Sequence, residues 1–479
     1  ASAVIKVTVE ELNLSEKEIS KVWRKVDSRV LALACLLYLA SYIDRANIGN
    51  AKVLGMSADL NLSANYYYLA LSIFFVGYVV FETPSNIILK FVGPRYYIPT
   101  LTIVWGGICA LVGTVQSGAG LVAIRFFLGL AEAGLLPGIT YLMATWYPRG
   151  KLGRRYAVLY STVSLTGAFG GLLATAIHSL NGRHGIAGWR WIFIVEGVVT
   201  VGIGLFALIV MYPYPENAKF LTERERQYLL AIHAKDRAQH KAQGLNWAYA
   251  KTAFKDYRTY LWGLIYFATY IPVYSVILSL PSVITGLGFE GTTATLMACP
   301  PYGLGFIVVL ISGYTSDKHR DRFWHAVIPC FVASAALIVL IAVTSNWVRY
   351  AMFFFVMFMF VPICTNWSWQ ANNTAGTNKR AVATGLIYSM GNIGGAIAGQ
   401  IYRAEWAPYY RPGHGINIAC FGVAVIAMIV IRWTYIRDNR LRDELLARDN
   451  ENSQETFTEQ DQLELDLGLL GDRHPRFRY

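Results

Sequence analysis

The sequence consists largely of apolar blocks, each about as long as a membrane is thick. Twelve such blocks follow one another along the chain, near residues 30–50, 66–90, 97–117, 120–144, 155–180, 190–211, 259–286, 293–315, 324–344, 348–369, 380–402 and 414–436. A helix of about 20 residues crosses the hydrocarbon core of a bilayer, since each residue adds about 1.5 Å to a core of about 30 Å. The pattern therefore predicts an all-α membrane protein with twelve transmembrane helices.

The composition excludes several other classes of protein. Of the 479 residues, 55% are hydrophobic and only 15% are charged, which is little charge for a soluble chain of this size. The net charge is +12, but the basic residues lie in short loops and form no continuous stripe, so we exclude nucleic acid as a partner. The six cysteines lie inside apolar blocks without metal-ligand spacing, and no nucleotide-binding or hydrolase motif is present. We therefore expect no metal, no cofactor, no catalytic residues and no enzyme activity.

The apolar blocks divide the chain into five segments. These are an N-terminal segment (1–29), a six-helix half (30–211), a central loop (212–258), a second six-helix half (259–436) and an acidic tail (437–479). In the central loop, Thr222 and Glu225 stand at the spacing of a capping box, which predicts an amphipathic helix. The tail is rich in acidic residues from Asp443 to Asp472, so we expect it to be disordered.

The basic residues predict the orientation in the membrane. Most of the 42 Lys and Arg residues lie in the N-terminal segment, the tail and alternate loops, all of which would share one side of the bilayer. Such residues accumulate on the cytoplasmic side of membrane proteins. We therefore expect both termini and the central loop to be cytoplasmic, with the plasma membrane as the location. The opposite side holds few basic residues: Lys52, Arg183, Arg190, Arg349, Arg403 and Arg411.

Glycines repeat at matching places in the two halves. The fifth block carries Gly167 and Gly171, and the eleventh carries Gly391, Gly395 and Gly399. Glycine at a spacing of four lets helix backbones approach closely. We expect these helices to pack at the interface between two pseudo-repeat halves, although ordinary tight packing within each half would give the same pattern. Halves of this kind imply alternating access to a site near the membrane midplane.

Several strings of residues resemble a known family of transporters. The string GYTSDKHRDR from Gly313 to Arg322, the string RFFLGLAEAGLLPG from Arg125, and GWRWIFIVEG from Gly188 are similar to motifs of the major facilitator superfamily. The resemblance implies the major facilitator fold. It also assigns Gly313, Asp317, Lys318 and Arg322 to a gating loop motif. The corresponding loop in the first half, KFVGPR from Lys90, lacks the acidic residue, which leaves its gating role in doubt.

The chain resembles one family within that superfamily more narrowly. It is similar to the anion:cation symporters, and among these to the fungal allantoate, nicotinate and pantothenate permeases. The strings that carry this resemblance include YIDRANIGNA, ETPSN, PPYG, WSWQANNTAG and APYYRPGHG, in the expected order. In these symporters the arginine of the string R-x-N-[IL]-G contacts the anion, which implies substrate binding by Arg45.

A few charged residues lie inside the apolar blocks: Asp44, Arg45, Glu82, Arg125, Glu132 and Glu196. A charge at the centre of a bilayer costs about 2.5–3.5 kcal/mol on insertion scales, so each needs a partner or a water-filled cavity. Asp44 and Arg45 are adjacent and point about 100° apart on a helix. We expect one to face the substrate path while the other bonds a neighbouring helix. A structural ion pair is the alternative for Arg45, and Asn47 is either a ligand or a packing residue.

Arg125 and Glu132 are seven residues apart and so lie on one face of a helix, with Gly129 leaving room between them. A fixed cation and a titratable carboxylate along one cavity wall could couple an anion to a proton. We expect Arg125 to bind the anion or take part in gating, and Glu132 to carry the proton. Asp44 is the second candidate for proton coupling. The alternative for Arg125 and Glu132 is a buried ion pair that braces two helices.

The tenth block carries a polar stripe. Asn366, Gln370 and Asn373 stand at i, i+4 and i+7, next to Trp367. A polar stripe within a membrane helix faces protein or water rather than lipid. The amides could therefore bind the substrate while the indole stacks on a planar group. Hydrogen bonding between helices would explain the same stripe.

Together these residues predict a secondary active transporter that takes up a small organic anion with protons. At 100 mV, inside negative, each anionic charge that enters costs about 2.3 kcal/mol, so uptake needs protons as a second partner. Efflux of a drug or secondary metabolite by the same fold is the alternative. The fifth block lacks the glycine–proline motif common in exporters, which favours import. A transporter-like nutrient sensor is the third reading, but such sensors usually carry a long additional cytoplasmic domain.

Overall fold

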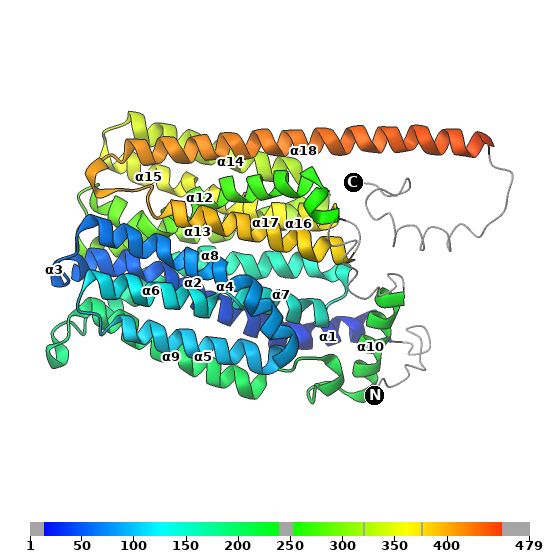
Figure 1. Ribbon diagram of the computed structural model, residues 1–479, viewed down its shortest axis with the longest axis horizontal. Helices are drawn as coiled ribbons and strands as arrows, with labels where there is room; N and C mark the ends of the chain where they lie inside the picture. Colours follow the sequence, from blue (N-terminus) through cyan, green and yellow to red (C-terminus); the bar gives the residue numbers. More distant parts are fainter. Residues whose placement is uncertain (1–13, 239–251, 320, 375–376, 453–479) are drawn as a thin grey trace.

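The computed structural model describes residues 14–238, 252–319, 321–374 and 377–452, and it shows a bundle of long, roughly parallel helices (Figure 1). The first half contains α1 (Glu16–Val26), α2 (Ala32–Ala51), α3 (Ser57–Asp59), α4 (Ala64–Val92), α5 (Pro94–Val112), α6 (Gly118–Glu132), α7 (Leu135–Trp146), α8 (Arg149–His178) and α9 (Gly188–Val210). The helix α10 (Glu223–Ala238) follows in the central loop. The second half contains α12 (Tyr257–Thr285), α13 (Gly291–His319), α14 (Phe323–Ala342), α15 (Asn346–Val356), α16 (Phe360–Asn372), α17 (Thr377–Ala398) and α18 (Arg411–Asn452).

The predicted fold class is confirmed. Within the described residues, eleven helical stretches are long and apolar enough to cross a membrane, and the shorter apolar stretch Val382–Ala398 of α17 occupies the position of the remaining predicted span. Two of the predicted spans consist of two consecutive helices, because α6 is followed by α7 and α15 by α16 with only a short break. The result is the predicted bundle of two six-helix halves.

The two halves meet through the glycines that the sequence singles out. A methyl group on Gly167 of α8 would overlap the ring of Tyr302 on α13, and one on Gly395 of α17 would overlap the ring of Phe75 on α4. The pairs α8–α13 and α4–α17 therefore join the halves, and in Figure 1 the blue-to-cyan first half lies against the green-to-orange second half. The prediction that the glycines lie at the interface is confirmed for Gly167, Gly171, Gly395 and Gly399. It is wrong for Gly391, where a methyl group would meet Tyr270 of α12 in the same half. Each glycine helix packs against a different helix of the other half, not against its own counterpart.

Gly395→Ala is expected to destabilise the protein, whereas Gly385→Ala on the same helix should not. The added methyl group at Gly395 must displace the Phe75 ring, while the same group at Gly385 meets open space. Overpacking of this kind costs about 1–3 kcal/mol. Thermal unfolding of the purified variants, followed by size-exclusion chromatography, measures the difference. Equal unfolding temperatures for the two variants would show that the α4–α17 contact tolerates wider spacing.

The two ends of the bundle differ, and we name them after helices in Figure 1. The α1 end carries α1, α10 and the last turns of α18, and the α3 end carries α3 and the short turns between spans. At the α1 end the predicted capping box is present, because the Glu225 backbone N–H donates to the Thr222 hydroxyl and the Glu225 carboxylate accepts from the Thr222 N–H. Lys25 of α1 forms a 2.7 Å ion pair with Glu225, which attaches α10 to the first half.

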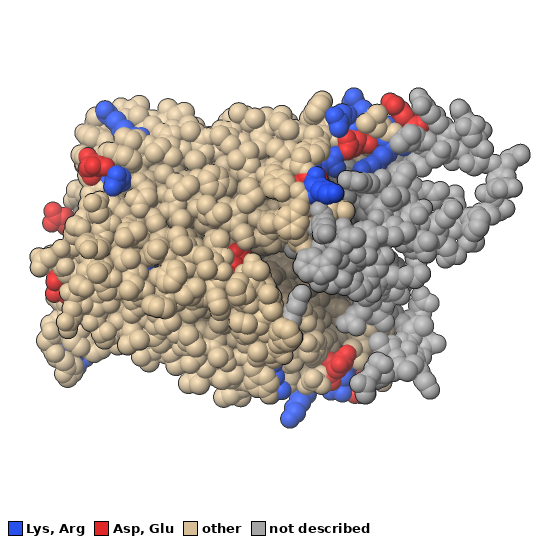
Figure 2. Space-filling view, in the orientation of Figure 1, with Lys and Arg blue, Asp and Glu red and all other residues tan. Residues whose placement is uncertain are grey.

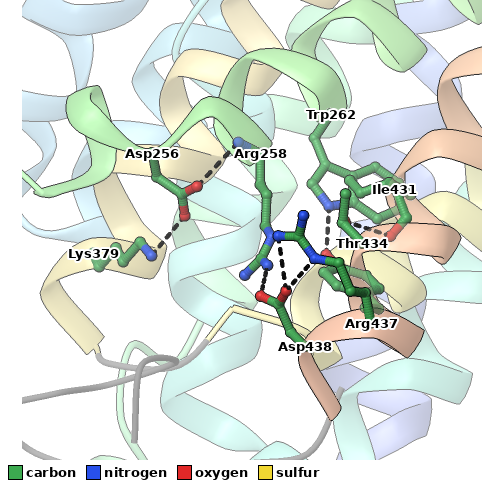
Figure 3. Close-up of polar contacts among 9 residues, drawn as sticks. Asp256, Arg258, Trp262, Lys379, Ile431, Thr434, Arg437 and Asp438 are labelled. Atoms are coloured by element: carbon green, nitrogen blue, oxygen red, sulfur yellow. Dashed lines mark hydrogen bonds and ion pairs between the residues drawn. The ribbon is translucent and has the colours of Figure 1, made fainter. Parts of the chain in front are cut away.

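The prediction of a disordered tail is wrong for its first part, because α18 continues as a helix to Asn452. A helix that emerges from an apolar span is already nucleated, so continuing it costs little. Basic residues also alternate with the acidic ones along this segment, and Asp438 pairs with Arg258 of α12 (Figure 3). Beside it Lys379 of α17 pairs with Asp256 at 2.7 Å, so that α12, α17 and α18 are joined at the α1 end. Residues 453–479 lie outside the described part of the chain.

Candidate functional site

A buried ion pair joins α2 and α6 in the middle of the first half. Nη2 of Arg45 lies 2.7 Å from Oε1 of Glu132, and the Ser41 hydroxyl donates to the same carboxylate oxygen. Arg45 is 3% exposed and Glu132 is fully buried. Ser41 and Arg45 are one turn apart on α2, so that helix presents a donor and a cation together to the Glu132 carboxylate. The charges compensate each other in a setting where either one alone would be costly.

Aromatic rings surround the Arg45 guanidinium and connect it to the other half of the protein. The guanidinium carbon lies 4.7 Å from the ring centroid of Tyr42, 4.9 Å from that of Phe74 and 5.3 Å from that of Tyr78. Its Nη1 donates at 3.1 Å to the Tyr274 hydroxyl of α12. Such ring faces stabilise a cation that has been removed from water. Arg45 therefore lies at the interface between the halves, in contact with both.

The predicted arrangement of Arg125 and Glu132 along one cavity wall is not found, because neither residue lines the cavity described below. The alternative, an ion pair that braces two helices, is present, but not between these two residues. Glu132 pairs with Arg45 instead, and Arg125 has no ion pair within 4 Å among the described residues. Arg125 is 2% exposed, its Nε and Nη2 lack hydrogen-bond partners, and its guanidinium carbon lies 5.8 Å from the Phe193 ring. Gly129 leaves no room for a substrate either, since a methyl group there would overlap the backbone of Phe74 on α4. The glycine serves close packing of α4 on α6.

Asp44 and Asn47 face away from the interface and bond the helices behind α2. The Asp44 carboxylate accepts from Trp105 Nε1 of α5 and from the Thr200 hydroxyl of α9, each at 3.1 Å. One turn on, the Asn47 amide donates to Glu196 of α9, while its oxygen accepts from Asn50 at 2.7 Å. Asp44 and Arg45 thus point to different neighbours, because Arg45 bonds α6 and the other half while Asp44 bonds α5 and α9. Whether Arg45 faces the substrate path stays a prediction.

A cavity of about 2290 Å³ opens between the halves at the α1 end. Figure 2 shows the molecule hollowed there, beside a tan surface that is almost free of charge. Of the predicted site residues, Trp367, Gln370, Asp317 and Arg322 line this cavity. The remaining ones do not line it, and they are Asp44, Arg45, Asn47, Arg125, Glu132, Gly313, Lys318, Asn366 and Asn373. Of the predicted charged residues within the membrane spans, Asp44, Arg45, Arg125 and Glu132 thus lie buried in the first half and away from the cavity wall.

The polar stripe on α16 is divided between the cavity and the protein interior. Gln370 lines the cavity, and its amide donates to the hydroxyls of Thr374 at 3.2 Å and Thr384 at 3.4 Å. Asn373 donates at 2.7 Å to a backbone carbonyl of its own helix, which favours a packing role there. The Asn366 amide is fully buried, and neither its nitrogen nor its oxygen has a hydrogen-bond partner in the part of the chain that the structure describes. Asn366 thus keeps free hydrogen-bonding capacity in the interior.

A chain of aromatic rings connects the cavity wall to Arg45. Trp367 and Tyr388 line the cavity with ring centroids 5.5 Å apart, and Tyr388 lies 5.5 Å from Tyr266 of α12. Along α12 the rings of Tyr266 and Tyr270 are 5.7 Å apart, and those of Tyr270 and Tyr274 are 5.6 Å apart. Tyr274 then bonds Arg45. The sequence interpretation missed this link, although tyrosines that recur every four residues mark one face of α12.

The loop motif lies at the mouth of the cavity. Arg322 forms an ion pair with Asp317, and its Nη1 donates at 3.0 Å to the Ser316 hydroxyl. Lys318 is exposed, and a methyl group on Gly313 would lie 3.4 Å from Ala157 of α8 in the other half. The motif therefore closes the turn after α13 and touches the first half at the cavity rim.

Within the described residues, the bundle of membrane-length helices in two halves, with a cavity between them and buried charges behind it, is typical of a membrane transporter. The chain belongs to the Major Facilitator Superfamily, whose family model matches residues 34–399. It is 33% identical over 442 residues to an uncharacterized transporter of Schizosaccharomyces pombe, covering 92% of this chain and 91% of that one. It is 32% identical to the MFS-type transporter cnsO of Penicillium expansum, covering 96% and 90% of the two chains. It is 30% identical to the major facilitator-type transporter hxnP of Emericella nidulans, covering 95% and 92%.

Solved structures share the fold at low sequence identity. A D-xylose–proton symporter superposes with a TM-score of 0.65 at 14% identity, covering 83% of this chain and 96% of that one. A bacterial homologue of the human lysosomal transporter Spinster, in an inward-facing and unoccupied conformation, superposes with a TM-score of 0.62 at 15% identity, covering 84% and 94%.

Proposed function

We propose that this protein is a proton-coupled symporter of the anion:cation symporter type, which imports a small organic anion, such as a vitamin-like or ureide carboxylate, across the plasma membrane. The observation that carries the proposal is the buried Arg45–Glu132 pair, which bonds Tyr274 of the opposite half. A guanidinium is suited to a carboxylate because it offers parallel N–H donors. Its present partner is a carboxylate that can be neutralised by a proton.

The pair couples the anion to the proton by competition. Arg45 can compensate Glu132 or a carboxylate substrate, and an anion that takes its donors leaves Glu132 buried without a cation. A buried carboxylate without a partner is strongly disfavoured unless it is protonated. Anion binding and protonation of Glu132 therefore promote each other, and the linkage is reciprocal. Since Tyr274 contributes to the same site from the second half, closure of the halves around the anion depends on the occupancy of Arg45.

The mouth of the cavity is suited to anions. Its lining includes the basic residues Arg24, Lys151, Arg154, Arg155 and Arg322, together with the acidic residues Glu16, Asp27 and Asp317. An excess of basic side chains around a cleft concentrates anions there. In the orientation that the loop charges favour, this mouth is cytoplasmic and the α3 end is extracellular, so that the structure corresponds to the state that releases an imported anion.

A topology measurement tests this orientation. A short epitope inserted near Pro412, in the first turn of α18 at the α3 end, should be labelled from outside intact cells, and an epitope after Tyr479 should not. The basic residues concentrate at the α1 end, and such residues remain on the cytoplasmic side. Permeabilised cells serve as the control, because both epitopes should then be labelled. Labelling of the C-terminal epitope on intact cells would reverse the assignment.

Uptake into proteoliposomes tests the function itself. A panel of labelled carboxylates, including nicotinate, pantothenate and allantoate, is offered with and without an inwardly directed proton gradient. We expect at least one carboxylate to accumulate only when the gradient is present, since one proton per monoanion removes the electrical cost of entry. Transport of uncharged compounds in preference to the carboxylates would contradict the proposal. Accumulation that requires the opposite gradient would favour efflux.

A further inference from the structure

Glu82 of α4 is an acidic residue in the cavity wall that the coupling mechanism does not yet use. It is 5% exposed, it lines the cavity, and its Oε2 accepts a hydrogen bond at 3.1 Å from the Ser389 hydroxyl of α17 in the other half. Among the described residues, no Lys, Arg or His nitrogen lies within 4 Å of its carboxylate. An anion carrier thus holds an uncompensated carboxyl group on its own substrate path.

Glu82 marks the point at which the two halves separate. From the α3 end inward, α4 and α17 are joined by Gln400 donating to the Tyr68 carbonyl at 3.0 Å and by Ser72 donating to the Ala396 carbonyl at 2.6 Å. After the contact of Gly395 with the Phe75 ring, the Glu82–Ser389 bond is the next hydrogen bond in this series. Beyond it the same two helices line the cavity through Asn86, Leu89, Gly385 and Val382. Glu82 therefore lies at the apex of the cavity, bonded across the interface on one side and open to the cavity on the other.

Tyr78 lies between Glu82 and the buried pair. It is one turn before Glu82 on the same face of α4, and the Arg45 guanidinium carbon is 5.3 Å from its ring centroid. Tyr78 is close enough to interact electrostatically with Glu82, Arg45 and Glu132. The titratable groups that face Glu82 are Tyr78 on its own helix and Tyr388 on α17. Tyr78 thus carries a hydroxyl group within electrostatic range of both the Glu132 and the Glu82 carboxyl groups.

We infer that Glu82 is a second proton-binding residue, through which the proton held at Glu132 reaches the cavity by way of Tyr78. The inference rests on the proposed function, in which Glu132 exchanges a proton. Glu132 itself is fully buried and does not line the cavity, so a proton that leaves it must pass through other groups. The Tyr78 hydroxyl accepts the proton from Glu132 and gives its own to the Glu82 carboxylate. Glu132 becomes ionised beside Arg45. Glu82 becomes the neutral acid, which then releases its proton into the cavity.

Infrared spectroscopy of the full-length protein in phosphatidylcholine vesicles tests the inference without a substrate. A protonated carboxyl group has its own C=O stretching band, which shifts in D₂O. The wild-type spectrum minus that of Glu82→Gln should contain such a band, and its amplitude should follow the bath pH between about pH 5 and pH 8, the range in which a proton carrier must titrate. The matched control is Glu196→Gln, which removes a buried carboxyl group that bonds Asn47 and does not line the cavity. Its band should not follow the bath pH.

The rate of deuterium exchange at Glu132 tests the route. This measurement is made with a saturating concentration of a carboxylate that the uptake panel identifies, because an anion on Arg45 leaves Glu132 protonated. The Glu132 band is then the one lost in Glu132→Gln, and its shift in D₂O should be about tenfold slower or more in Tyr78→Phe and in Glu82→Gln. If Glu82→Gln does not fold, Ser389→Ala keeps the acid and should shift its band by removing the bond across the interface. A wild-type spectrum equal to that of Glu82→Gln at every pH, or an unchanged exchange rate at Glu132, would overturn the inference. Absence of a protonated Glu132 band while the carboxylate is bound would instead refute the proposed coupling.

Discussion

Replacing Arg45 by glutamine is expected to reduce anion uptake by about 100-fold or more, while the protein still folds and reaches the membrane. The variant loses two charge-assisted N–H donors to the anion carboxylate, each worth about 1.5–3 kcal/mol. Every 1.4 kcal/mol corresponds to a factor of ten. Folding survives because Glu132, once deprived of its cation, can take a proton and so avoid the cost of a buried charge. Initial uptake rates in proteoliposomes, normalised to the amount of folded protein, measure the loss.

Two further variants separate binding from bracing. Arg45→Lys keeps the charge but loses the parallel donors, so it should recover part of the uptake at best. The double variant Arg45→Gln with Glu132→Gln removes both buried charges. If the pair served only as a brace, this variant would recover both stability and transport relative to Arg45→Gln. We expect stability without transport. Near-normal affinity and rate in Arg45→Gln would assign Arg45 to a structural role.

Arg125→Gln is the matched comparison, because Arg125 is as deeply buried as Arg45 but has no ion pair among the described residues. We expect it also to abolish uptake without loss of surface expression. A buried charge without a partner costs free energy within a membrane, and a neutral residue at the same position would remove this cost. Such a charge is therefore expected to serve a function. Wild-type uptake by this variant would identify Arg125 as a bystander.

The fold could be predicted from the sequence because the bilayer imposes a simple rule. Blocks of about 20 apolar residues have to form helices, and the count of such blocks defines the bundle. The glycines at 167 and 395 also pointed to the interface, because only very close helix contacts require the absence of a side chain at such spacing. Asp44 and Arg45 were correctly expected to face different neighbours, since adjacent helical residues point about 100° apart.

The partners of the buried charges could not be predicted in the same way. Periodicity places Arg125 and Glu132 on one face of α6, but it does not say which helix packs against that face. The packing of α2 on α6 brings Arg45 to within 2.7 Å of Glu132, and this contact between residues 87 positions apart leaves no local signal. Tyr274 is a similar case, because its bond to Arg45 depends on how the two halves meet. The acidic residues of the tail predicted disorder, but the apolar span of α18 already nucleates a helix that continues to Asn452.

Replacing Glu132 by glutamine is expected to separate exchange from net transport. Glutamine resembles the permanently protonated acid, so Arg45 remains free for the anion in both the loaded and the empty carrier. The variant should therefore still exchange labelled for unlabelled anion across the membrane, at a rate within about tenfold of the wild type. It should lose accumulation driven by a proton gradient, because no group then takes a proton when the anion binds and returns it when the anion leaves.

Two assays on the same proteoliposomes distinguish these activities. Counterflow measures anion exchange, and gradient-driven uptake measures net transport. Glu196→Gln is the control, since Glu196 is buried and bonds Asn47 but does not touch Arg45. The Glu196→Gln variant should retain coupling if the Glu196 carboxyl group only joins α2 to α9.

If Glu132→Gln still accumulated anion against a gradient, the proton would have to be carried by another carboxyl group. Asp44 would then be the first candidate, because it is buried beside Trp105 and Thr200 with one carboxylate oxygen that has no partner. Arg45 would remain the anion ligand in that case. Because Asp44 is the neighbour of Arg45 on α2, anion binding at Arg45 would then be linked to protonation of Asp44 through this helix.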